Sequence, residues 1–182
     1  MKKTIAVLVL ALFVTAGAFA SILQIGPAAT IDFNPQEFEV EGLKDIGKYQ
    51  FGAEARVNLF FLQAGANASF SLPNPDGNWK IETMLSANLV AGPKLVNVSV
   101  GAAIPYTFLF GPDAKGMDLG SFLEQPLYLK AGLNFNFAFV GVGASYYIPT
   151  GLAVNKVISD IGSISPDITK GKLSLAVFFN IL

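Results

Sequence analysis

The chain of 182 residues contains neither cysteine nor histidine. The absence of cysteine excludes disulfides and thiol chemistry. The two absences together exclude Ser-His and Cys-His hydrolytic centres and metal sites built on histidine. We therefore predict that the protein is not an enzyme and that it holds no cofactor and no metal.

The N-terminal segment has the parts of a secretory signal peptide. Lys2-Lys3 precedes an apolar run from Ile5 to Val14, and Ala18-Phe19-Ala20 forms an Ala-x-Ala cleavage site. The run is too short to span a bilayer as a helix. We predict cleavage after Ala20; the alternative is an uncleaved N-terminal anchor helix.

Charge is scarce in the remainder, residues 21–182, which we expect to form one domain. Without Lys2 and Lys3 it holds 10 basic and 13 acidic residues, a net charge of −3, and no basic run that would favour nucleic acid as a partner. Hydrophobic residues make up 52% of the chain, yet no later stretch is long enough for a membrane helix. An exported hydrophobic chain of this kind can enter a bilayer as a closed barrel, which satisfies every backbone polar group internally.

Alternation of apolar and polar residues is the strongest pattern present. Apolar residues occupy the odd positions of residues 49–59 and the even positions of residues 62–72, which is typical of strands between unlike environments. A tight hairpin centred between Phe60 and Phe61 explains the reversal, although the turn lacks Asn-Gly or Gly-X chemistry and a four-residue loop about the same centre stays open. The hairpin predicts three cross-strand pairs: Leu59 with Leu62, Phe51 with Phe70, and Glu54 with Asn67.

Six further segments alternate in the same way, so we predict an all-β, eight-stranded antiparallel up-and-down transmembrane β-barrel. The strands are expected at residues 23–33, 49–59, 62–72, 80–91, 96–104, 127–135, 138–148 and 172–181. Parity reverses across three short turns, at 60–61, 92–93 and 136–137. The four long loops fall at 34–48, 73–79, 111–125 and 149–169, and residues 153–164 could make a short helix. Pro27 is unfavourable in the first strand, because it lacks the backbone N–H that would donate a hydrogen bond to a neighbouring strand.

The apolar face is expected to point outward, toward lipid. The opposite face holds mostly small and amide side chains with few charges, which suits a crowded lumen better than a water-exposed surface. The aromatic residues Phe139, Tyr147 and Phe178 are also expected to point inward. We predict that acidic and basic lumen residues pair with one another, because a buried charge needs a partner. The polar candidates for the lumen are Asp32, Gln50, Glu54, Arg56, Asn67, Glu82, Asn88, Lys130 and Lys172.

With this strand count, loop alternation, signal peptide and length, the chain resembles the small eight-stranded outer-membrane barrels of the OmpA transmembrane domain, OmpX and OmpW type. The likeness is architectural and matches no motif residue by residue. It implies residence in the outer membrane, with outer-membrane lipid, lipopolysaccharide and the outer-membrane assembly machinery as partners. Those barrels commonly end in an aromatic residue, whereas this chain ends in Leu182.

Three functions remain open from the sequence. The first is a non-enzymatic barrel whose surface loops serve adhesion or envelope stability. The second, implied by likeness to the OmpW type, is passive transport of a small hydrophobic ligand across the outer membrane. The third is a soluble periplasmic carrier with the apolar face turned inward. A need for detergent separates the third from the other two, and single-channel conductance or ligand binding separates the first two.

Overall fold

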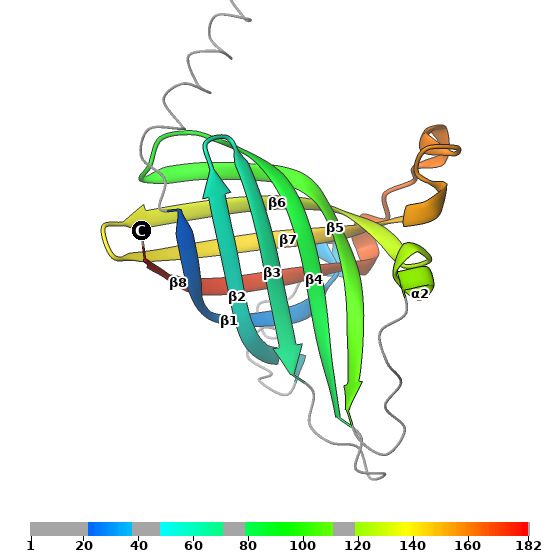
Figure 1. The fold of residues 1–182 in the computed structure, drawn as a ribbon, viewed down its shortest axis with the longest axis horizontal. Coiled ribbons are helices and arrows are strands. Elements are labelled where there is room, and N and C mark those ends of the chain that lie inside the picture. Colours follow the sequence, from blue (N-terminus) through cyan, green and yellow to red (C-terminus); the bar gives the residue numbers. More distant parts are fainter. Residues whose placement is uncertain (1–21, 38–47, 71–78, 111–118, 182) are drawn as a thin grey trace, which may run out of the picture.

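The computed structural model describes residues 22–37, 48–70, 79–110 and 119–181, so the expected signal peptide, residues 1–20, lies outside the described residues. Eight antiparallel strands pair with their neighbours in sequence, and the first closes against the last (Figure 1). This confirms the predicted eight-stranded antiparallel up-and-down barrel. The strands are β1 (Leu23–Phe33), β2 (Gln50–Leu59), β3 (Leu62–Phe70), β4 (Trp79–Ala91), β5 (Val96–Phe110), β6 (Pro126–Phe137), β7 (Val140–Ala153) and β8 (Gly171–Asn180).

The first hairpin, β2–β3, has the predicted register. All three expected pairs are present, Leu59 with Leu62, Phe51 with Phe70 and Glu54 with Asn67. The turn consists of Phe60 and Phe61 alone, and Phe60 has a positive φ of 57°. A positive φ at the first central residue lets a two-residue turn follow the twist of its strands, so the tight hairpin forms without a glycine.

The β4–β5 and β6–β7 turns differ from the first turn in conformation or in position. The β4–β5 turn contains Gly92 at φ 118°, a conformation that glycine adopts without steric cost. The β6–β7 turn is Ala138–Phe139, two residues later than predicted, because Phe137 pairs with Val140 and Asn136 with Gly141. Alternation alone does not distinguish the two positions, since a shift of two residues keeps every side chain on its face.

The opposite end of the barrel carries the long connections. β5 and β7 continue beyond their predicted ends, to Phe110 and Ala153. Residues 153–164, which could have made a short helix, form two 3-10 turns, η4 (Val154–Lys156) and η5 (Ile161–Ser163). A third, η6 (Ile168–Lys170), precedes β8. Two other short elements, η1 (Pro35–Glu37) and α2 (Leu119–Leu123), precede β2 and β6. No helix within the described ranges is long and apolar enough to cross a membrane.

The β7–β8 connection is tied back to the barrel although it projects beyond it (Figure 1). Backbone bonds run from Ser165 to the Thr150 carbonyl and from Asp167 to the Pro149 carbonyl. The Tyr146 hydroxyl lies within hydrogen-bond distance of the Phe33 and Ile168 carbonyls. These contacts hold the base of the loop against β1 and β7.

Pro27 leaves β1 continuous and disturbs only one side of it. The Leu23 carbonyl accepts from Ile181, so the odd positions of β1 bond to β8. The missing N–H of Pro27 therefore falls at the β1–β8 seam. There the pairing skips from Ile25 to Ala28, whereas pairing with β2 runs unbroken.

The two faces of the sheet differ sharply in polarity. Each strand exposes at least one large apolar side chain on its outer face, among them Ile25, Phe51, Leu62, Leu85, Val100, Leu133, Val142 and Leu175. The buried residues are mainly polar or charged, and most of them occupy inward positions of their strands. The barrel is thus apolar outside and polar inside, as the alternation predicted.

Candidate functional site: the packed polar lumen

Three charged residues form the centre of the lumen. Glu54 and Arg56 stand two positions apart on β2, so both point inward, and Lys130 reaches them from β6. Glu54 Oε1 lies 2.7 Å from Arg56 Nε and 3.5 Å from Lys130 Nζ. All three are at most 2% exposed. One carboxylate thus faces two cations in this central ion cluster.

Neutral side chains satisfy the remaining groups of Arg56. Its Nη1 donates to Asn134 Oδ1, its Nη2 lies 3.4 Å from Ser145 Oγ, and its guanidinium carbon stands 4.0 Å above the Phe178 ring. Planar stacking with hydrogen bonds from the edge is the arrangement that suits guanidinium in a dry site.

Glu54 and Lys130 are held in the same way. Asn67 donates to Glu54 Oε2 at 3.2 Å and to Ser174 Oγ at 2.8 Å, and Lys130 Nζ lies 3.3 Å from Ser86 Oγ. Side chains of six strands therefore meet the central ion cluster. Such coverage is what a buried charge needs to be tolerated.

A second ion group lies toward the long-loop end. Glu82 accepts from Lys80 at 2.7 Å through Oε1 and from Lys172 at 3.3 Å through Oε2. Lys172 also lies 3.7 Å from Asp32, whose side chain is 83% exposed. Asp32 was predicted in the lumen, but it lies at the mouth, because it is the last inward position of β1. Gln50 is half-buried near the same end.

Amide side chains close the short-turn end. Gln24 donates to Asn136 at 2.9 Å and to Asn180 at 2.8 Å, which links β1 to β6 and β8. Hydrogen bonds between side-chain amides continue around the wall from Gln24 through Asn58 and Gln63 to Asn88. Of the residues in this amide layer, only Asn88 was among the polar candidates predicted for the lumen. The signal that would have found the others was present, since all occupy inward parity near strand ends.

Aromatic residues fill the lumen between these polar groups. Phe178 and Tyr147 are 1% exposed, and Tyr147 clusters with Met84 and Ala103. Their predicted inward orientation is confirmed. That of Phe139 is wrong: it lies in the β6–β7 turn and is 81% exposed. The Tyr147 hydroxyl has no hydrogen-bond partner among the described residues.

The lumen is narrow at its short-turn end. The space at its short-turn end, lined by Gln24, Asn58, Gln63 and Asn97 among others, measures about 20 Å³, roughly enough for a single water. Within the described ranges no three acidic residues come together as metal ligands. Glu54 and Glu82 inside the barrel, and Asp32 at its mouth, are each paired with a basic side chain, as predicted.

Larger hollows lie on the outer wall. One of about 500 Å³ crosses β6, β7, β8 and β1, between Phe135 and Phe51, with Pro27, Ala29 and Ala144 along it. Another of about 640 Å³ crosses β2 to β5 near the short-turn end. Both are lined almost wholly by apolar side chains.

The strand pairing and the lumen define a closed antiparallel eight-stranded barrel with a polar, filled interior. No protein-family model matches the chain, and no curated protein matches it. Among solved structures it is similar to the N-terminal β-barrel domain of OprF from Pseudomonas aeruginosa. The sequence identity is 16% and the TM-score is 0.46, over 89% of this chain and 98% of that chain.

Proposed function

We propose that this chain is a non-enzymatic integral barrel of the outer membrane, whose strands anchor surface loops that serve adhesion or envelope stability. The observation that carries the proposal is the inverted polarity of the barrel. Large apolar side chains are exposed around all eight strands, while glutamate, arginine, lysine and amides are buried inside. A wall of this kind suits hydrocarbon and is costly in water.

The interior favours this function over a soluble ligand carrier. A carrier of small apolar molecules needs an apolar cavity of several hundred Å³. Here the corresponding space is occupied by the central ion cluster, the amide layer and the rings of Tyr147 and Phe178. The known geometry of small barrels agrees, since eight strands enclose little more than their own side chains.

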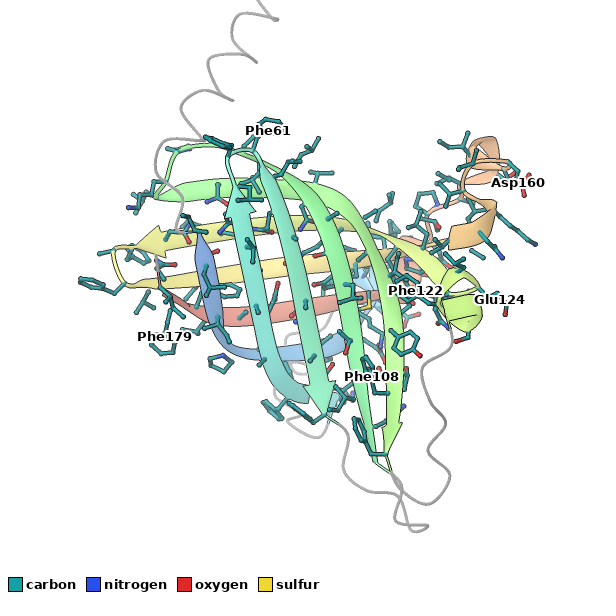
Figure 2. The ribbon with its side chains drawn as sticks, viewed as in Figure 1. Phe61, Phe108, Phe122, Glu124, Asp160 and Phe179 are labelled. Carbon is teal, nitrogen blue, oxygen red and sulfur yellow. The ribbon has the colours of Figure 1, made fainter. Side chains whose placement is uncertain are left out.

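The same packing favours a sealed barrel over a transporter of hydrophobic molecules. Arg56 stacked on Phe178 and Lys130 bonded to Glu54 lie across the axis. A solute would have to displace buried charges from their partners, which is costly. The surface role is therefore assigned to the loop end, where the ordered β7–β8 connection projects (Figure 2). The partners in this proposal are outer-membrane lipid, lipopolysaccharide and the assembly machinery.

The first test is fractionation of cells that express the full chain, followed by gel electrophoresis in mild SDS with and without boiling. We expect the protein in the outer-membrane pellet, with a mobility shift on boiling that reports a folded barrel. Recovery of the mature protein in the soluble periplasmic extract would contradict the proposal.

A further inference from the structure

The short-turn end carries bulky apolar side chains at the tips of its turns. Phe60 is 72% exposed in the β2–β3 turn, Leu95 is 54% exposed beside the β4–β5 turn, and Phe139 is 81% exposed in the β6–β7 turn. We call these three residues the turn rim. They continue the apolar outer wall, because the strand ends beneath them expose Leu59, Phe137 and Phe179.

The backbone at Phe60 shows that this aromatic residue is not required by the turn. Its φ of 57° lies in the left-handed region, which glycine and asparagine adopt at much lower cost than a bulky side chain. Most of the ring surface is exposed, so contacts within the barrel offset little of that cost. Neither the turn nor contacts within the barrel account for an aromatic side chain at this position.

Charge is distributed unequally between the two ends. Among the described residues, Lys94 is the sole charged side chain of the three short turns, and it is exposed. The described part of the long-loop end, by contrast, carries Glu37, Lys48, Glu124, Lys156, Asp160, Asp167 and Lys170. One end of the barrel is therefore suited to water and the other to an apolar boundary with anionic groups nearby.

We propose that the turn rim is inserted into the lipid leaflet at the short-turn end, at the boundary between headgroups and acyl chains, with Lys94 beside the lipid phosphates. The inference rests on the proposed function. It adds the position of the membrane boundary at this end of the barrel: the turns lie within the leaflet and do not project from it. Phenylalanine and leucine tips gain free energy by leaving water for this boundary. A lysine there extends its ammonium to the phosphate layer.

The test places a single tryptophan at chosen depths. Trp79 is the only tryptophan of the chain, so Trp79→Phe provides the background for Phe60→Trp and Phe139→Trp. Two references are added: Leu133→Trp on the outer wall, and Ile158→Trp at the 96% exposed tip of the β7–β8 connection. Each full-length variant is folded into phosphatidylcholine–phosphatidylglycerol vesicles with or without brominated acyl chains. Aqueous acrylamide is the opposing quencher.

We expect brominated lipid to reduce the emission of Phe60→Trp and Phe139→Trp to a degree comparable with Leu133→Trp, and acrylamide to quench only Ile158→Trp strongly. Rim variants that behave like Ile158→Trp would overturn the inference and leave the proposed function intact. Loss of lipid quenching in Leu133→Trp as well would overturn the proposed function itself. Rim variants shielded from both quenchers would instead indicate a protein partner or a second copy at this end, and would also overturn the inference.

A second measurement compares Phe139→Trp with and without the Lys94 side chain. Raising the phosphatidylglycerol content of the vesicles should blue-shift the emission of Phe139→Trp when Lys94 is present and much less in Lys94→Gln. Equal shifts with and without Lys94 would contradict the placement of this lysine beside the lipid phosphates. A folded-barrel gel shift establishes that each variant has folded before its fluorescence is compared.

Discussion

Glu54 is the residue on which two buried cations depend. Besides the carboxylate, Arg56 has Asn134, Ser145 and the Phe178 ring as partners. Lys130 has Ser86, and its Nζ lies 5.3 Å from the centre of the Tyr147 ring. Hydrogen bonds from neutral groups do not neutralise charge. Removing the carboxylate therefore leaves both cations uncompensated in a buried site.

We expect Glu54→Gln to lower the free energy of unfolding by about 3–5 kcal/mol, the usual loss when one member of a buried ion pair is removed. The amide keeps the shape of the side chain, so the loss reports charge. Urea titration in detergent micelles, followed by the folded band on unboiled gels, measures it. Glu82→Gln is the matched control: its carboxylate is partly exposed, and a loss of about 1 kcal/mol or less is expected. Equal losses in the two variants would contradict the distinction.

The Asp167 carboxylate holds a turn of the β7–β8 connection by accepting hydrogen bonds from the Thr169 amide and hydroxyl. The Thr169 hydroxyl, followed by Lys170 and the Thr169 amide, lowers the pKa of the Asp167 carboxyl below its ordinary value. A lowered folded-state pKa means that the contact stabilises the loop above the ordinary carboxyl pKa and is lost as the pH falls through the folded value.

Amide exchange at Thr169 should accordingly remain protected down to a pH below about 3.9, the ordinary aspartate pKa, and lose protection in stronger acid. Exchange measured by NMR in micelles tests this expectation. In Asp167→Ala the extra protection should be absent at every pH. Protection that is unchanged by the substitution would show that the carboxylate does not hold this turn.

At the scale of elements, some neighbouring strands approach one another so closely that no side chain fits between them. A Cβ atom at Gly52 would collide with the Ala68 carbonyl on β3 and lie 2.8 Å from Ser69 Cα; Gly26 faces Val177 of β8 in the same way. These neighbours are backbone atoms, which cannot rotate aside. Glycine at these two positions is therefore a requirement of strand pairing.

Gly52→Ala should cost about 1–3 kcal/mol of folding free energy, the range for forcing an extra methyl group into a packed site. Gly162→Ala in the β7–β8 connection is the control, since a Cβ there meets nothing within 4 Å, and surface substitutions usually change stability by about 0.5 kcal/mol or less. Urea titration of both variants in micelles makes the comparison. A neutral Gly52→Ala would mean that β2 and β3 separate at little cost.

At the scale of the whole molecule, the barrel has an apolar outer wall and a charged interior, the distribution of polarity that the proposed function requires. The surface hollow between Phe135 and Phe51 belongs to the same wall and is apolar. Leu175 lies about midway along β8, exposed on this wall, which places it near the centre of a bilayer in the proposed function.

Leu175→Arg should destabilise the barrel in phospholipid vesicles by about 2–4 kcal/mol, the penalty for arginine at the bilayer midplane. Ile158→Arg, at the exposed loop tip, should leave stability unchanged. Denaturant unfolding in vesicles, followed by tryptophan emission, measures both. A neutral effect of Leu175→Arg would indicate that water, and not lipid, surrounds the wall.

Sequence alternation predicted the fold well, because the face on which a side chain lies depends only on its position within its own strand. The parity reversal between residues 49–59 and 62–72, together with a turn centred between Phe60 and Phe61, placed Glu54 opposite Asn67, and a slip of one residue would have turned every apolar side chain inward. The β6–β7 turn escaped the same argument, because a slip of two residues preserves parity. Phe139 was placed inward for that reason and in fact lies at the tip of the turn.

Parity likewise located the candidate site in part. It identified Glu54, Arg56, Asn67, Asn88 and Lys130 as inward residues, and all five are buried. It did not give their height along the barrel axis. Asp32 shares their parity but stands at the mouth, where solvent reaches it.

The sequence alone thus determined the number of strands, the face of most side chains and the polarity of the two sides of the wall, because the side-chain period of a strand is two. Only the tertiary structure decided which inward residues meet. Arg56 contacts Asn134 and Ser145, 78 and 89 residues away, and Gln24 reaches Asn180 across 156 residues. Those contacts depend on the tilt and stagger with which eight strands close, a property of the whole ring that no single strand encodes.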